Sequence, residues 1–152
     1  MLEELNNFIR INNLSAEVFE VRGKADTAFK AAARIKYPEK AVKSILLIDS
    51  NKDAILVVLR GVDKIDFQKV KKVLEVKDVR MALQEEVFKI TGYEVGGVPP
   101  ISVYGVTIIV DKAVAERDDI VCGGGDTIHL MKLRVKEMLE NIEEPIIEDV
   151  KK

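Results

Sequence analysis

The sequence predicts an α+β fold in a single domain that covers residues 1–152. Segments with the spacing of helices alternate along the chain with short apolar runs typical of strands. Two of those runs, 41–49 and 54–60, are joined by the turn-forming residues "DSNKD", and so short a connection favours an antiparallel hairpin. A chain of 152 residues can bury one core and is short for two ordinary domains. We therefore expect a mixed, mostly antiparallel β-sheet with flanking helices.

The first half of the chain has the pattern helix, strand, helix, strand, strand. Apolar residues recur at helical spacing in the opening "LEELNNFIRINNL", which Ser15 ends, and "AEVFEV" alternates like a short strand. Asp26 or Thr27 can cap a helix through "AFKAAARI". This helix stops before the Tyr37-Pro38 turn, because the residue before a proline avoids the α region. The two hairpin strands follow.

The second half continues the alternation of helices and strands. A helix over 66–76 has four apolar residues on one face, and a helix over 83–92 closes with Gly92 in the left-handed conformation common after a helix. We expect a turn at Asp111 and a last helix over 134–142 that runs into an acidic tail, 143–152. Strands are predicted over 78–82, 103–110, 119–123 and 128–133.

Composition and charge limit the classes of function. The net charge is -2 and the pI about 5.6, so any contact with nucleic acid must be local. One cysteine cannot form an internal disulfide, and no apolar stretch approaches the ~18 residues of a membrane span. The opening "MLEELNNFIR" also lacks the order of a signal peptide. We expect a cytoplasmic protein that makes no membrane contact.

The familiar catalytic and metal-binding motifs are absent from the sequence. It contains no H-E-x-x-H, paired-cysteine ligand set, G-x-S-x-G or Walker A motif, and one histidine with one cysteine cannot build an ordinary zinc site. We expect no metal and no cofactor. Three features remain: Lys43 inside an apolar strand, the loop "TGYEVGGVPP" over 91–100, and "CGGGDTIH" over 122–129.

Each of these features has a functional and a structural interpretation. Lys43 could hold a phosphate or a developing oxyanion at the floor of a pocket, or it could extend along apolar surface to solvent. The glycine turns could offer backbone N–H groups to a ligand, or they could be plain tight connections. His129, on the face of Thr127 and Met131, could contact a ligand or be a satisfied structural histidine. Cys122 is predicted to be a small buried side chain.

The order of these motifs resembles the YbaK and prolyl-tRNA editing domain family of aminoacyl-tRNA deacylases. The resemblance covers roughly residues 15–141 and is strongest in "VKSILLI", "TGYEVGGV" and the triple glycine. It implies a trans-editing enzyme that hydrolyses the ester between a wrong amino acid and the 3'-terminal adenosine of a tRNA. The implied substrate is tRNA-Pro carrying a small non-cognate amino acid such as cysteine, alanine or serine, which a synthetase pocket rejects poorly.

The resemblance also implies roles for individual residues. Lys43 matches the family's pocket lysine, which would bind the terminal phosphate or ribose region and favour the transition-state charge. The two glycine turns would form pocket walls, and His129 would help to position the aminoacyl group. The family has no dedicated protein nucleophile, and the vicinal ribose hydroxyl is thought to assist the attacking water. The residues expected to bind substrate are Ser44, Gly96, Gly97, Val98, Gly123, Gly124, Gly125 and His129.

The expected partner is the acceptor end of an aminoacyl-tRNA. Because the net charge is low, binding should be weak with a shallow salt dependence, so help from prolyl-tRNA synthetase or an elongation factor is expected. Pro99 and Ile101 depart from the family's usual Ser-Pro-Phe-Gly, so the resemblance does not fix the detailed shape of this loop. Lys69, Lys71 and Lys72 form either an RNA contact or an ordinary solvated face.

Two alternatives to a deacylase remain open. The first is a non-catalytic module of the same fold that binds tRNA or a synthetase without hydrolysis. The second is a nucleotide-binding regulator that uses the "GGGD" turn.

Overall fold

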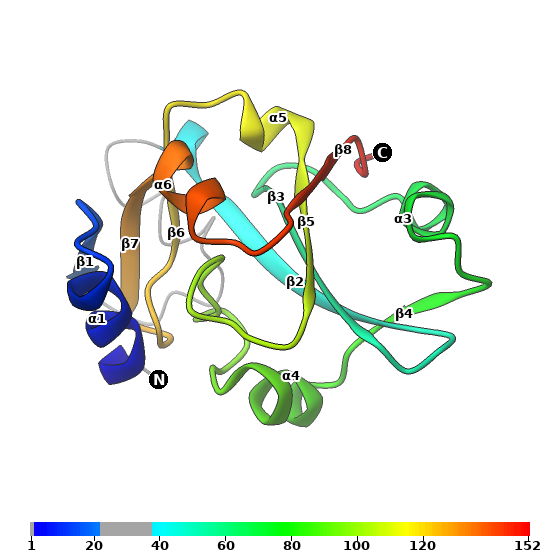
Figure 1. Cartoon of the computed structure of the whole chain (residues 1–152), viewed down its shortest axis with the longest axis horizontal. Coiled ribbons are helices and arrows are strands. Elements are labelled where there is room, and N and C mark those ends of the chain that lie inside the picture. The colour runs from blue at the N-terminus through cyan, green and yellow to red at the C-terminus, as the bar shows by residue number, and fades with distance from the viewer. Residues whose placement is uncertain (1, 22–37) are drawn as a thin grey trace.

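The computed structural model describes residues 2–21 and 38–152, and the strands within these ranges form two sheets (Figure 1). The helix predicted through "AFKAAARI" lies outside the described residues. The small antiparallel sheet has the order β1 (Glu17–Glu20), β7 (His129–Arg134), β6 (Asp119–Gly123). The large sheet has the order β4 (Val79–Met81), β2 (Val42–Asp49), β3 (Ala54–Arg60), β5 (Thr107–Asp111), β8 (Ile146–Glu148).

The helices lie between and around these strands. They are α1 (Leu2–Ile11), the 3-10 turn η1 (Pro38–Lys40), α3 (Phe67–Leu74), α4 (Gln84–Thr91), α5 (Lys112–Ala115) and α6 (Val135–Glu140). Figure 1 shows α1 beside the small sheet on the left and α3 on the right, beyond the large sheet. None of the helices in the described ranges is both long and apolar enough to cross a membrane. The α+β prediction is confirmed.

The predicted β2–β3 hairpin is present and antiparallel, from Val42 opposite Arg60 to Ile48 opposite Ala54. Its turn is closed by the Asp49 carboxylate, which accepts the N–H groups of Asn51 and Asp53, each at 2.9 Å. The remaining pairs of the large sheet are of both kinds: β4 is antiparallel to β2, whereas β5 is parallel to β3 and β8 is parallel to β5. The large sheet is therefore mixed, as predicted, although the strands divide into two sheets instead of one.

Residues 143–152, predicted as an acidic tail, contain the edge strand β8 and are part of the fold. Ile146 aligns with Ile109 of β5, and Val150 is fully buried. The Val150 N–H donates to the carboxylate of buried Asp111 at 2.9 Å. This corrects the prediction of a tail, because the two isoleucines between the acidic residues supply enough apolar surface to pair with β5.

Two further differences concern the chain around β5. The strand predicted over 103–110 begins only at Thr107, because Ser102 and Gly105 have positive φ values of 62° and 74° and turn the chain. The turn expected at Asp111 is the start of α5. The Asp111 carboxylate caps this helix by accepting the Ala113 N–H at 3.0 Å. Gly92 ends α4 with a φ of 79°, as predicted.

The side chains of β2 and β3 alternate between two cores. One core joins the large sheet to the small one, and the other lies under α3. The first contains Val42, Leu46, Leu56, Val58, Cys122 and Met131, and the second contains Leu47, Ile55, Val57, Leu59, Ile65 and Val70. Odd-numbered residues of β2 therefore face the α3 side, and even-numbered residues face the small sheet.

The lysine face of α3 is partly occupied by internal contacts. The Lys69 ammonium donates to the Asp149 carboxylate at 2.9 Å and to the Lys151 carbonyl at 2.8 Å. Because both partners belong to the C-terminal segment, Lys69 links this segment to α3. Among the three lysines predicted to share this face, Lys71 and Lys72 remain as candidates for a contact with RNA.

Candidate functional site

The two glycine-bearing turns pack directly against each other. The Gly125 N–H donates to the Gly97 carbonyl at 3.0 Å. A Cβ atom at Gly97 would lie 2.7 Å from the Asp126 Cα, and one at Gly123 would overlap the Val98 carbonyl oxygen. Real side chains do not approach backbone so closely, so Gly97 and Gly123 are required by the contact between the turns.

Several backbone amides of these turns are used inside the protein. The Gly97 N–H donates to the Glu94 carbonyl at 2.9 Å and the Gly124 N–H donates to the His129 carbonyl at 3.1 Å, in addition to the bond from Gly125. Within the described part of the chain, the N–H groups of Gly96 and Val98 donate no hydrogen bond. These two amides are therefore the ones that could be offered to an acceptor on a ligand.

The strand that carries Lys43 starts next to the strand that leads into the second glycine turn. Ala41, directly before β2, forms an isolated parallel bridge with Val121 of β6, and no further pair joins β2 to β6 among the described residues. Val42 and Cys122, which follow the bridged residues, belong to the same core. The bridge therefore anchors the chain two residues before Lys43 and two residues before Gly123.

The side chain of Lys43 is half-buried and reaches toward the turn that follows β3. Its ammonium donates to the Gly61 carbonyl at 3.3 Å, and among the described residues no hydrogen bond joins it to either glycine turn. Partial burial lowers the pKa of Lys43; the Asp63 carboxylate acts against this shift, and the Lys64 ammonium adds to it. Lys43 therefore loses its proton at a lower pH than a fully solvated lysine would.

Ser44 points to the face of β2 opposite to that of Lys43. Its neighbours on that face, Val42 and Leu46, belong to the first core. The Ser44 Oγ is buried and has no hydrogen-bond partner within the described ranges. The two residues thus cannot bind a ligand from the same face of the strand, although they are adjacent in the sequence.

Replacing Ser44 by alanine tests what this hydroxyl does. Because a buried hydroxyl without a partner costs about 1–3 kcal/mol, Ser44→Ala is expected to leave the free energy of unfolding unchanged or raise it by about 1 kcal/mol. Urea unfolding measures this change, with exposed Ser50→Ala as the control. A loss of more than about 1 kcal/mol would instead show that the hydroxyl has a bonded partner in the folded protein.

His129 is paired with an aspartate that the sequence analysis missed. The His129 Nδ1 lies 2.7 Å from the Asp126 Oδ1, which also accepts the Ile128 N–H at 3.0 Å. In the neutral imidazole this carboxylate holds the hydrogen on Nδ1 and leaves Nε2 as an acceptor. The His129 side chain is 19% exposed, so part of the ring is in contact with solvent. The sequence signal for this pair was an aspartate directly after the triple glycine and three residues before the histidine.

The structure therefore brings some of the predicted residues together and separates others. Both glycine turns and the His129–Asp126 pair are contiguous, and the start of β2 is bridged to β6 two residues before Lys43. Strand alternation directs His129 to the face of Met131, which belongs to the first core, whereas Lys43 is on the face of β2 that belongs to the second core. Cys122 is fully buried, as predicted, and burial raises the pKa of its thiol, so it is not a reactive group.

Most of the chain matches a known protein family. Residues 23–140 match the family model described as the aminoacyl-tRNA editing domain. The chain belongs to the aminoacyl-tRNA editing domain family. The match spans Lys43, both glycine turns and His129, and it confirms the resemblance inferred from the motifs.

Similar sequences occur within a larger enzyme. The editing domain is 32% identical over 105 residues to a proline–tRNA ligase of Halalkalibacterium halodurans, a match that covers 69% of this chain and 18% of the ligase. The chain thus spans less than a fifth of the length of this curated relative.

Solved structures share the fold of this editing domain over nearly its whole length. The crystal structure of the hypothetical protein APE2540 is 25% identical with a TM-score of 0.87, and the match covers 98% of this chain and 99% of that one. A second structure, that of a candidate trans-editing enzyme for prolyl tRNA synthetase, is 22% identical with a TM-score of 0.86 and matches 99% of this chain and 96% of its own. At 22% identity, the match to the second structure shows that the two chains share a fold.

Proposed function

We propose that this editing domain is a trans-acting deacylase that hydrolyses the ester of mischarged aminoacyl-tRNA. The observation that supports the proposal most directly is the pair of packed glycine turns in an editing-domain chain, with a half-buried lysine two residues after the bridge that joins the start of β2 to β6. The proposed substrates are tRNA-Pro molecules carrying alanine, cysteine or serine. The proposed partners are the acceptor end of the tRNA and, for delivery, prolyl-tRNA synthetase or an elongation factor.

The proposed reaction needs stabilisation of negative charge more than a nucleophilic side chain. Water attacks the ester carbonyl, the bond to the ribose oxygen breaks, and the proton from water ends on that oxygen, which leaves free amino acid and tRNA. The carbonyl oxygen carries negative charge in between. A partly buried ammonium and unpaired backbone N–H groups are the kinds of donor that stabilise such an oxyanion. Lys43 supplies the first in this proposal, and Gly96 and Val98 supply the second.

His129 takes the role of a substrate-positioning group in this proposal, and because strand alternation directs it to the face of Met131 and not to that of Lys43, it would contact a different part of the substrate. With its Nδ1 hydrogen directed to Asp126, the imidazole presents Nε2 as an acceptor. The α-ammonium of an aminoacyl ester is a donor that fits this acceptor. Ser44, on the opposite face of β2, would contribute through its buried hydroxyl or through the packing of the strand.

A deacylation screen tests the proposal. The purified chain is incubated with tRNA-Pro charged with alanine, cysteine, serine or proline, and the remaining aminoacyl-tRNA is followed over time against samples without protein. We expect rapid loss of at least one mischarged species while prolyl-tRNA is spared. Binding of the same tRNAs without hydrolysis of any would overturn the proposal in favour of a non-catalytic tRNA-binding module. Binding of free nucleotide at the "GGGD" turn, without hydrolysis, would favour the regulator.

A further inference from the structure

The turn that follows β3 is held rigidly by an ion pair. The Asp63 N–H donates to the Arg60 carbonyl at 3.1 Å and closes the turn. The Arg60 guanidinium binds the Asp63 carboxylate through two bonds, Nε to Oδ2 at 2.7 Å and Nη2 to Oδ1 at 3.1 Å. The Asp63 side chain is only 13% exposed. A bidentate, partly shielded pair of this kind fixes both side chains in one geometry.

This turn is also the place where the Lys43 side chain ends. The Gly61 N–H donates to the Ala41 carbonyl at 2.9 Å, and the Gly61 carbonyl accepts the Lys43 ammonium. The charged groups that act on Lys43 among the described residues, Asp63 and Lys64, both belong to this segment. The segment therefore controls both the position of the ammonium and the electrostatic potential at it.

The C-terminal residues fix this segment from the other side. The Asp66 N–H donates to the Val150 carbonyl at 2.8 Å, the Lys152 N–H donates to the Lys64 carbonyl at 2.9 Å, and Ile65 forms an antiparallel bridge with Lys151. The C-terminal members of these pairs, residues 150–152, lie beyond the segment 23–140 that matches the family model.

We propose that Asp63 is a positioning residue for Lys43: Arg60 binds both oxygens of its carboxylate, so the Lys43 ammonium is held by the Gly61 carbonyl of the same turn and stays available to an oxygen of the substrate. A half-buried ammonium with no negative charge nearby tends to lose its proton. A carboxylate bound directly to Lys43 would instead occupy the ammonium and keep it from a phosphate or an oxyanion. Because Arg60 takes both oxygens of Asp63, the charge acts on Lys43 while the ammonium stays available. This inference rests on the proposed deacylase function for its catalytic meaning.

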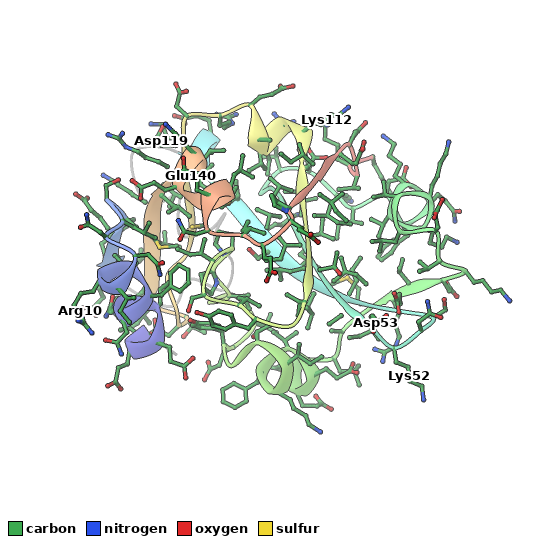
Figure 2. All side chains as sticks on the ribbon, viewed as in Figure 1. Arg10, Lys52, Asp53, Lys112, Asp119 and Glu140 are labelled. Atoms are coloured by element: carbon green, nitrogen blue, oxygen red, sulfur yellow. The ribbon has the colours of Figure 1, made fainter. Side chains whose placement is uncertain are left out.

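Two substitutions in this turn are expected to move the titration of Lys43 in opposite directions. Asp63→Asn removes the negative charge, so the lysine should lose its proton at a lower pH. Arg60→Gln removes a positive charge and releases the Asp63 carboxylate toward Lys43, so the titration should move to higher pH. Asp53→Asn, the same chemical change at the tip of the β2–β3 hairpin, should leave it unchanged (Figure 2).

Two readouts separate this inference from the proposed function. The first is direct titration of the lysine side-chain signals by NMR, with Lys43 assigned by its loss in Lys43→Met; it does not depend on activity. The second is the pH profile of kcat/KM for deacylation: Asp63→Asn should lose activity several-fold at the alkaline end, and its deficit should become smaller as the pH falls.

Shifts of the Lys43 signal in the same direction for both variants, or no shift in either, would overturn the inference even if the protein is an active deacylase. Opposite shifts in a protein that hydrolyses no aminoacyl-tRNA would support the electrostatic role of Asp63 and reject only the proposed function. Melting temperatures of each variant confirm that the folded protein is being titrated. If Asp63→Asn is unfolded, the test is Arg60→Gln alone: a Lys43 titration at higher pH supports the role of Asp63, and an unchanged or lower one overturns it.

Discussion

Gly123→Ala is expected to destabilise the protein by about 3 kcal/mol or more, or to prevent it from folding. The added Cβ would overlap the Val98 carbonyl oxygen and lie 2.9 Å from the Val98 carbonyl carbon and 3.0 Å from that of Gly97. These are backbone atoms of the opposite turn, and the hydrogen bond from Gly125 to Gly97 prevents that turn from moving away. The loss is measured by urea unfolding, as a lower free energy of unfolding or as absence of a folded baseline.

Gly105→Ala is the matched control for this substitution. Gly105 has a φ of 74°, but a Cβ there would meet no atom within 4 Å. Its replacement should therefore cost only the strain of the left-handed conformation, about 1 kcal/mol. If the two variants lose equal stability, the two glycine turns are not packed in solution as the structure shows.

Lys43→Met is expected to reduce deacylation by about 100-fold or more, because it removes the proposed oxyanion-stabilising charge and keeps the aliphatic stem. The free energy of unfolding should change by less than about 1 kcal/mol, since the ammonium makes a single 3.3 Å hydrogen bond to Gly61. Single-turnover hydrolysis of the substrate found in the screen measures the first quantity, and urea unfolding measures the second.

Lys52→Met serves as the control for Lys43→Met. Lys52 is exposed at the tip of the β2–β3 hairpin (Figure 2), and its replacement should leave both quantities unchanged. Retention of hydrolysis within about threefold in Lys43→Met would remove this lysine from the mechanism and move attention to the Gly96 and Val98 amides.

The parts of the fold that were predicted from the sequence depend on local signals. The β2–β3 hairpin follows from the turn residues around Asp49, and α3 begins at Asp66, whose carboxylate accepts the N–H groups of Gln68 and Lys69. The parallel pairs with β5 and β8 join segments that are distant in the chain, and no local pattern specifies them. The strand β8 also lies at a sheet edge, where Ile147 is 39% exposed, so its sequence lacks the regular alternation of a half-buried strand.

The site was predictable in its residue types and not in its contacts. Lys43, the glycine turns and His129 stand out because each breaks the pattern around it. Their partners Gly61, Asp63 and Asp126 do not, since ordinary turn residues become significant only when distant segments meet. Adjacency in sequence was also a poor guide: Ser44 follows Lys43 but belongs to the opposite face of the strand.

During translation, β5 is synthesised well before β8, the strand that pairs with one of its edges. Until residues 146–152 have left the ribosome, one side of β5 has no partner strand, and the buried carboxylate of Asp111 lacks the Val150 amide that it accepts in the finished protein. The turn beneath Lys43 gains its backbone bonds to the C-terminal residues at the same late moment. A nascent chain that has already formed the β2–β3 hairpin therefore holds an incomplete site until residues 146–152 are available to pair with β5.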